Sequence, residues 1–267
     1  SEQFRAYTDD PDIPLFNRAV AGTYPIGSTV KPVIAAAALN EGVIRPDTVV
    51  GSTGGIQVGP WFFPDWKAGG HGTVDVRSSI AWSVNTFYYH IGGGYREFAG
   101  LGIDLLRMYL KKFGYGRNVG IDLPGEASGF IPSRAWKQDE LGEEWYIGDT
   151  YKLSIGQGDL IVTPHQIAMQ TAAIANGGTL YRPRIAKTLI DPVTGERHDI
   201  KPQSIRTDLA SASTITTIRD GMRECVVYGS CRQLVALPVM VAGKTGTALW
   251  NQNKANHAWF TSFAPYD

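Results

Sequence analysis

A serine and a lysine three residues apart form the stretch of this sequence with the clearest potential for chemistry. Ser28 and Lys31 follow Pro25 and Gly27, which mark a turn, and precede a run of helix-forming residues. We expect a helix to start at Ser28, at or near its N-cap, and to end before Gly42. Residues i and i+3 share one face of a helix, so the hydroxyl and the amine can come within hydrogen-bond reach.

Such a pair can act as a nucleophile and its general base. The Ser28 hydroxyl becomes a good nucleophile only when a base removes its proton, and a helix N-terminus favours the negative charge that develops. Lys31 can remove the proton only as a neutral amine. Its pKa must therefore fall from about 10.4 to near neutrality, through burial and a neighbouring cation. Taken alone, an N-cap serine followed by a solvated lysine would explain the same pattern.

Two further patterns follow along the chain. Residues 83–85 read Ser-Val-Asn and residues 244–246 read Lys-Thr-Gly, and S-x-x-K, S-x-N and K-T-G each occur once. The ordered trio resembles the motifs of class A β-lactamases and penicillin-binding proteins. The flanking sequences are similar to those of class B penicillin-binding proteins, and most to the elongation-type penicillin-binding protein 2 group. These flanks are Tyr24 to Pro32, Asp65 to Gly72, Ser154 to Gly158 and Thr261 to Tyr266.

The resemblance implies catalytic roles for the first two motifs. Ser28 would be the nucleophile that becomes acylated, with Lys31 as its base. Ser83 would carry a proton to the leaving amine. Asn85 would hold the substrate amide and hydrogen-bond Lys31.

The resemblance assigns substrate binding to the third motif. Lys244, Thr245 and Gly246 would lie on a strand that walls the site, where the Lys244 ammonium would recognise a carboxylate and lower the pKa of Lys31. The backbone N–H groups of Ser28 and Thr247 would form the oxyanion hole. The strand edge would let an extended peptide add on through main-chain hydrogen bonds.

The implied activity is that of a peptidoglycan D,D-transpeptidase. The serine would attack the D-Ala-D-Ala carbonyl of a stem peptide, release the last D-Ala and pass the acyl group to an amine of a neighbouring strand. β-Lactam antibiotics would acylate the same serine. The implied partner is a membrane glycosyltransferase of the elongation machinery. The implied location is the periplasmic, extracytoplasmic face of the bacterial membrane, with an anchor outside this chain.

Two alternative functions fit the same motifs. A serine β-lactamase or β-lactam sensor shares the chemistry of acylation. The sequence contains no E-x-x-x-N stretch, so the deacylating glutamate of class A β-lactamases has no counterpart, although class D-like enzymes do not need it. A protein of another class, a non-catalytic module that binds cell-wall peptides, is the second alternative.

Composition sets limits on fold and function. The 267 residues are 43% hydrophobic, which is enough for a full core, and one domain or one domain with a helical subdomain is expected. The 25 basic and 25 acidic residues leave no net charge, so composition does not support nucleic-acid binding. No run of 18 apolar residues and no signal-like start occurs, so we expect a soluble chain.

The expected fold class is α/β (α+β), with an antiparallel sheet flanked by helices, an all-helical subdomain, and some edge strands missing. Residues 1–27 should be extended, 51–72 loop-rich and 121–145 irregular. The periodicity predicts helices over 76–90, 98–113, 165–176 and 212–227. It predicts strands over 45–50, 180–190, 239–249 and 258–264, with a hairpin turn at 191–195 and an antiparallel pairing of the last two.

Three smaller features carry expectations of their own. Trp61, Phe62, Phe63 and Trp66 either line a groove or pack a loop against the body. An aspartate and a histidine, Asp65 and His71, are spaced as zinc ligands can be. Some elongation-type relatives are thought to hold a metal here with a further carboxylate and a cysteine.

In this sequence those two additional ligands are absent, since Val84 and small residues around Gly51 stand in their place. We therefore expect neither a metal nor another cofactor, and structural hydrogen bonds for Asp65 and His71. Cys225 and Cys231 are the only cysteines, and they form either a loop-closing disulfide or two free thiols.

The resemblance extends from about Leu15 to Asp267, so residues 1–267 read as one transpeptidase domain. Relatives open this domain with two strands before the serine-bearing helix and close it with a fifth strand and a long helix. None of these is recognisable here, so we expect a domain truncated at both ends, without its membrane anchor and N-terminal pedestal. An open sheet predicts marginal stability or aggregation of the isolated chain.

Overall fold

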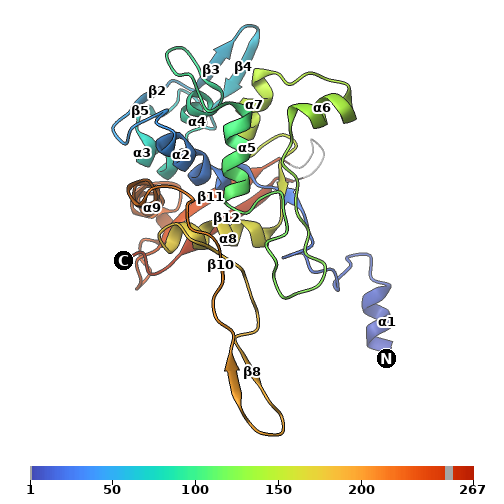
Figure 1. The fold of residues 1–267 in the computed structure, drawn as a ribbon. Helices are drawn as coiled ribbons and strands as arrows, with labels where there is room; N and C mark the ends of the chain where they lie inside the picture. Colours follow the sequence, from blue (N-terminus) through green and yellow to red (C-terminus); the bar gives the residue numbers. More distant parts are fainter. Residues whose placement is uncertain (1, 250–254) are drawn as a thin grey trace.

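The computed structural model describes residues 2–249 and 255–267. Two long antiparallel strands, β11 (Ala242–Ala248) and β12 (His257–Phe263), cross the middle of the molecule (Figure 1). Helix α9 (Ala212–Val227) packs on β11, and α8 (Pro164–Ala175) packs on β12. Most other helices gather above these strands in this view. The arrangement confirms the expected α/β class, with an antiparallel sheet flanked by helices and a helical part.

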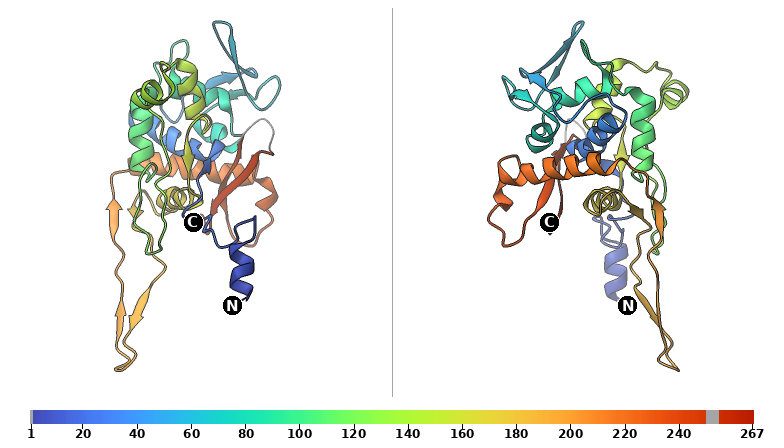
Figure 2. Two further views of the ribbon diagram at one scale, coloured as in Figure 1. Left: turned by 90° about the vertical axis from the view of Figure 1, so that its right-hand side faces the viewer. Right: turned by 60° about the vertical axis from the view of Figure 1, so that its left-hand side comes forward.

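The other helical elements, in chain order, are α1 (Glu2–Thr8), η1 (Gly27–Val30), α2 (Lys31–Asn40), α3 (Val76–Ala81), α4 (Asn85–Gly93), α5 (Gly102–Lys112), α6 (Arg134–Leu141), α7 (Ile147–Ser154) and η2 (Arg232–Leu234), where η is a 3-10 helix. The other strands form antiparallel pairs: β1 (Tyr24–Pro25) with β6 (Ile161–Val162), β2 (Val50–Ser52) with β5 (Gly72–Val74), β3 (Gly55–Val58) with β4 (Trp61–Pro64), β7 (Leu180–Tyr181) with β10 (Ser204–Arg206), and β8 (Thr188–Ile190) with β9 (Arg197–Asp199). The β8–β9 hairpin extends far from the body, as both views of Figure 2 show.

Helix α2 is the central helix of the core. All its residues from Lys31 to Ala38 are buried, because α4, α5 and α9 surround it. A helix that is apolar on every side is stable only inside a protein, and the alanine-rich sequence lets its neighbours approach closely. Lys31 is the one charged residue of this helix, so the fold carries an ammonium group into its core.

Helix α8 supports the sheet and begins as the sequence predicts. Thr163 caps it, since its hydroxyl accepts a hydrogen bond from the Gln166 backbone N–H (3.1 Å), and Pro164 occupies the first turn. Further along the helix, the fully buried Gln170 donates to the carbonyl of Thr29 in η1 (3.1 Å). The helix thus connects the sheet to the turn that carries Ser28.

Several expected elements are confirmed. Helices α8 and α9 and strands β11 and β12 lie within a few residues of the predicted ranges, and the last two strands pair antiparallel. Residues 191–195 form the turn between β8 and β9.

Three expectations about irregular regions were wrong. Residues 1–27 include the helix α1, which has no buried residue and is stabilised locally, for example by the hydrogen bond from Gln3 to Tyr7. Residues 51–72 contain strands of two antiparallel pairs. Residues 121–145 contain α6, which Ser133 caps at its start and Gly142 ends in a left-handed conformation. The cap residues of α6 give only a weak sequence signal, because no long apolar period accompanies them.

The expected helix boundaries near the first two motifs also need correction. The helix predicted over 76–90 is two helices, α3 and α4, separated by residues 82–84. The α-helix after the first motif begins at Lys31, and Ser28 belongs to the preceding 3-10 turn rather than to an N-cap. Helix α5 begins at Gly102, four residues later than predicted. None of the helices in the described part of the chain is long and apolar enough to cross a membrane.

The cap of α8 gives a stability prediction. Thr163→Ala should lower the free energy of unfolding by about 1 kcal/mol, because it leaves the buried start of α8 without its side-chain acceptor. The exposed Thr216→Ala in α9 is the matched control. Among the described residues, its hydroxyl bonds only the Ala212 carbonyl one turn back, so that change should be nearly neutral. Urea unfolding followed by circular dichroism measures both, and equal midpoints for the two variants would contradict the role of the cap.

Candidate active site

The turn that carries Ser28 packs directly against strand β11. Gly27 has a φ of +58°, and a Cβ at this position would lie 2.5 Å from the Thr247 carbonyl oxygen. A Cβ at Gly246 would lie 2.8 Å from a methyl carbon of Thr29. Glycine at both positions is therefore required for the first and third motifs to touch, which places the Ser28 hydroxyl beside β11.

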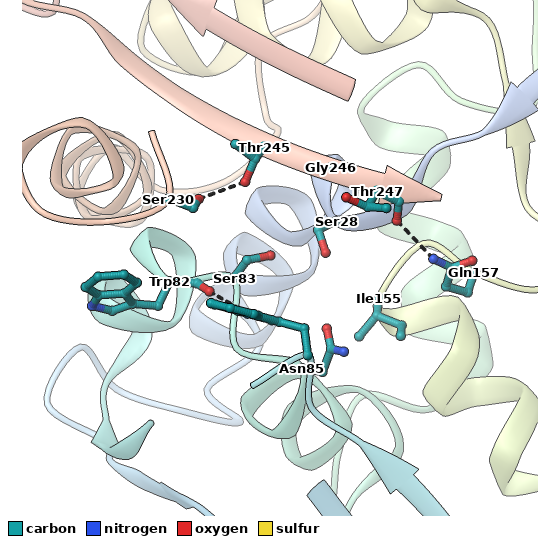
Figure 3. A pocket seen from close by; sticks show the side chains of 11 residues that line it. Ser28, Trp82, Ser83, Asn85, Ile155, Gln157, Ser230, Thr245, Gly246 and Thr247 are labelled. Atoms are coloured by element: carbon teal, nitrogen blue, oxygen red, sulfur yellow. Dashed lines mark hydrogen bonds between the residues drawn. The ribbon is translucent and has the colours of Figure 1, made fainter. Parts of the chain in front are cut away.

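The second motif lies in the break between α3 and α4. Ser83 has a φ of +59°, a conformation that residues other than glycine adopt rarely and that clusters at functional sites. Val84 is extended and fully buried, and α4 starts at Asn85. The break turns both polar side chains of the motif towards Ser28, as Figure 3 shows.

Lys31 connects the first motif to the second. Its Nζ donates hydrogen bonds to the Ser83 carbonyl oxygen (2.7 Å), to Asn85 Oδ1 (2.7 Å) and, more weakly, to Ser83 Oγ (3.3 Å). The side chain is completely buried, and this desolvation lowers the pKa of Lys31 to about 7, while the negative charge of Asp65 partly opposes the shift. The hydrogen bond to Asn85 expected from the sequence is therefore formed.

Ser28 has a different environment from the one expected. No hydrogen bond between its hydroxyl and Lys31 Nζ occurs in the described residues, since the three donor contacts of the ammonium group all go to the second motif. The Ser28 hydroxyl instead lines a pocket of about 360 Å³. The nucleophile candidate is thus open to a ligand, and the base candidate lies behind it.

Strand alternation divides the third motif between two faces. Thr245 and Thr247 share the face that lines the pocket, whereas the side chain of Lys244 is completely buried. Lys244 Nζ donates to the Thr245 carbonyl oxygen (2.9 Å). Burial, and then the charge of Lys31, hold the pKa of Lys244 well below its ordinary value. Both lysines therefore lie behind the pocket wall.

The pocket brings six of the eight predicted site residues together in its lining: Ser28, Ser83, Asn85, Thr245, Gly246 and Thr247. The other lining residues, which are not among the predicted site residues, are Trp66, Trp82, Ile155, Gln157 and Ser230. Gln157 donates to the Thr247 carbonyl (3.1 Å), as Figure 3 shows. The Trp66 indole donates to the Trp82 carbonyl (2.9 Å). The flank 154–158, already similar to the family, was the available signal for Gln157.

The aromatic loop residues do not form one surface. Trp66 lines the pocket beside Ser28, whereas Trp61 and Phe63 line a second hollow of about 470 Å³ with Tyr146 and Ile147. Trp61 remains 70% exposed. Trp66 therefore lines one hollow, and Trp61 and Phe63 line another.

Asp65 organises the start of α4. Its buried carboxylate accepts hydrogen bonds from the backbone N–H groups of Asn85 (3.0 Å), Thr86 (3.2 Å) and Trp66 (2.9 Å), and from the hydroxyls of Thr86 (3.0 Å) and Ser52 (3.1 Å). A carboxylate at a helix N-terminus is stabilised by the helix dipole and by the unpaired N–H groups. Asp65 thus makes the structural hydrogen bonds expected of it.

His71 does not behave as expected. Both ring nitrogens are buried without a hydrogen-bond partner in the described residues, although Nδ1 lies 3.8 Å from Asp65 Oδ2. Burial lowers the pKa of His71, so the ring is neutral at pH 7.

No cluster of three or more His, Cys, Asp or Glu side chains able to hold a metal ion occurs within residues 2–249 and 255–267. With the Asp65 carboxylate engaged by five donors, these residues do not fit a zinc site.

The two cysteines form a disulfide. Cys225, near the end of α9, is bonded to Cys231, with their Cα atoms 5.0 Å apart. Of the two alternatives that the sequence left open, the loop-closing disulfide is the one found. The closed loop contains Ser230, which contacts the third motif.

Comparisons with known proteins agree with this geometry. A family model described as the penicillin binding protein transpeptidase domain matches residues 1–267. The peptidoglycan D,D-transpeptidase MrdA of Haemophilus influenzae is 35% identical over 292 residues, which cover 100% of this chain and 43% of the relative. The chain therefore spans less than half the length of that relative.

Two solved structures are similar over nearly the whole chain. The structure of Pseudomonas aeruginosa PBP2 in complex with WCK 5153 has a TM-score of 0.83 and 35% identity, and the match covers 100% of this chain and 59% of that one. A ceftriaxone acyl-enzyme complex of penicillin-binding protein A from M. tuberculosis has a TM-score of 0.80 and 26% identity, with coverage of 99% and 57%.

The hydrogen bonds of Asp65 give a second prediction. In Asp65→Asn the amide NH2 group must face N–H or O–H donors, so we expect a loss of about 3 kcal/mol in the free energy of unfolding. Asp47→Asn is the control, because Asp47 is 74% exposed in its pair with Arg45 and should contribute less than about 0.5 kcal/mol. Equal urea midpoints for the two variants would disprove the structural role of Asp65.

Proposed function

Because the chain belongs to the family of penicillin-binding protein transpeptidase domains, we propose that it is a serine D,D-transpeptidase that cross-links peptidoglycan stem peptides. The observation that supports the proposal most directly is a pocket-lining serine beside a buried lysine whose pKa is about 7. At that pKa, roughly half of the molecules carry a neutral Lys31 at pH 7. A neutral amine is the form of lysine that can act as a general base.

Acylation would proceed from this neutral form. Lys31 accepts the Ser28 proton after giving up its weakest contact, the 3.3 Å hydrogen bond to Ser83 Oγ. Ser28 Oγ then bonds to the carbonyl carbon of the penultimate D-Ala, and the oxyanion is held by the backbone N–H groups of Ser28 and Thr247. Asn85, held by Lys31 and by Asp65, binds the amide of the substrate.

Acylation produces free D-Ala and an ester of Ser28, and it requires that the second motif transfer a proton to the leaving amine. Ser83 contacts Lys31 with both its carbonyl and its hydroxyl, so it can pass the proton from Lys31 to the departing amine as the peptide bond breaks. D-Ala leaves as the free amino acid, and the peptide remains as an ester of Ser28. An amine of a second stem peptide attacks this ester, forms the new amide and restores the Ser28 hydroxyl.

β-Lactams would form the same ester, and its lifetime separates a transpeptidase from a β-lactamase. A β-lactamase must activate a water molecule against the ester. None of the residues lining the pocket in the described part of the chain is Asp or Glu, so no carboxylate stands ready for that step. This supports a transpeptidase rather than a β-lactamase of the class A type, which deacylates through a glutamate.

The wider setting is proposed from the elongation-type resemblance. We place the domain on the extracytoplasmic, periplasmic face of the cell membrane and expect a membrane glycosyltransferase of the elongation machinery as partner. The Cys225–Cys231 disulfide supports this location, because disulfides persist in oxidising compartments. The assignment of 1–267 as one transpeptidase domain is supported by the family match over the same residues.

The third prediction concerns the identity of the nucleophile and the fate of the ester. Benzylpenicillin should add once to the wild-type chain, on Ser28, and the adduct should persist for hours in intact-mass spectra. Ser28→Ala should form no adduct while keeping its circular dichroism spectrum. The exposed Ser128→Ala should react like the wild type.

Three results would contradict the assignment of Ser28 as the nucleophile of a transpeptidase. An adduct on the Ser28→Ala variant would exclude Ser28 as the nucleophile. Free protein with steadily hydrolysed penicillin would identify a β-lactamase. A wild-type chain that forms no adduct but still binds cell-wall peptide would identify a non-catalytic binding module.

The fourth prediction concerns pH. Burial lowers the pKa of Lys31 to about 7, so the base is protonated below this pH and neutral above it. The rate constant of acylation should therefore rise between pH 6 and 8 and level off above, as stopped-flow acylation by nitrocefin would measure. In Lys31→Arg the side chain stays protonated, so the rate constant of acylation should fall by about 10²–10⁴-fold. A flat profile, or a fast Arg variant, would rule out Lys31 as the base.

A further inference from the structure

A short segment after α9, residues 229–231, connects the second and third motifs without belonging to either. The Ser230 backbone N–H donates to the carbonyl of Ala81 (3.0 Å), which is two residues before Ser83. Its hydroxyl lies 2.7 Å from the hydroxyl of Thr245. Ser230 also lines the pocket that contains Ser28, and Figure 3 shows it facing Thr245 at one end of that pocket.

The segment is held in place independently of any ligand. The disulfide joins Cys231 back to Cys225 in α9, and the Cys231 N–H donates to the Cys225 carbonyl (2.9 Å). Gly229 packs so closely on α3 that a Cβ there would lie 2.3 Å from the Ala81 carbonyl oxygen. The position of the Ser230 hydroxyl is therefore set by the fold, as a preorganised binding group requires.

The chemistry around this hydroxyl suits an anion. Ser230 Oγ and Thr245 Oγ1 each carry a proton, and in the hydrogen bond between them only one proton is used. The other two contacts of Ser230 Oγ, with Cys225 Sγ at 3.3 Å and Cys231 Sγ at 4.0 Å, involve sulfur atoms that have no proton in the disulfide and can only accept. When a carboxylate replaces the hydrogen bond between them, the two adjacent hydroxyls can each donate their one proton to one of its two oxygens. No acidic side chain occurs among the described lining residues.

We infer that Ser230 is a further substrate-binding residue, which receives, together with Thr245, the free carboxylate of the donor peptide or of a penicillin. The disulfide loop positions it for this contact. The inference rests on the proposed function, because it concerns the substrate of the same site. It assigns the direct contact with the carboxylate to two hydroxyls rather than to Lys244, whose side chain is completely buried.

Benzylpenicillin and its methyl ester test this inference, since they differ only in the carboxylate. Acylation of Ser28 is followed by intact-mass spectrometry under second-order conditions. Ser230→Ala should slow acylation by benzylpenicillin about tenfold, because a hydrogen bond to a charged group is lost. The rate with the methyl ester should change less than twofold. Ser230→Thr, which keeps the hydroxyl, should restore most of the rate with the acid, and Ser128→Ala is the inert control.

A second arm tests the role of the disulfide. The double variant Cys225→Ala, Cys231→Ala, with its fold checked by circular dichroism, should lose rate with the acid and much less with the ester. Equal slowing of acid and ester by Ser230→Ala would show that Ser230 is merely structural, and no slowing of either would show that it does not meet the carboxylate. Both results overturn the inference while leaving Ser28 labelling intact. A wild-type chain that neither compound acylates would overturn the proposed function, and the inference with it.

Discussion

Burial of the Lys31 ammonium group is the constraint on which the rest of the site depends. In the described chain no carboxylate lies within ion-pair distance of Nζ, and the nearest negative charge that influences it, Asp65, acts at longer range. Desolvation therefore dominates. A pKa of about 7 in place of 10.5 corresponds to roughly 5 kcal/mol in favour of the neutral amine. The fold thus stabilises the reactive form of the base at the cost of burying a lysine.

Several elements around Lys31 determine how its amine is buried and which hydrogen-bond partners it finds there. Helix α2 brings the side chain inside, and the break at Ser83 offers carbonyl and hydroxyl oxygens where a continuous helix would use its own carbonyls internally. Asp65 fixes the start of α4 and with it the amide oxygen of Asn85. The two lysine amines, of Lys31 and Lys244, thus lie buried behind the pocket wall, while the pocket surface carries neutral donors and acceptors.

Much of the site was predictable because its functional residues belong to three short sequence motifs. Ser28, Ser83, Asn85 and Thr245 meet in one pocket as expected, although more than 200 residues separate the first from the last. The contacts depend on backbone features that have no periodic signal. The positive φ of Ser83 splits a stretch whose apolar pattern reads as a single helix. Ser230 reaches the pocket on a loop that the Cys225–Cys231 disulfide closes, and the spacing of the two cysteines alone left that disulfide undecided.

The pKa of Lys31 is the quantity that tests this account most directly. Lysine labelled with ¹³C at Cε gives one NMR signal per side chain, and the signal lost in Lys31→Met identifies the residue. We predict that this signal titrates with a midpoint near 7, well below the exposed lysines of the same spectrum. A midpoint near the ordinary lysine value of about 10.4 would mean that Lys31 is charged at neutral pH. It would contradict its role as the base that activates Ser28.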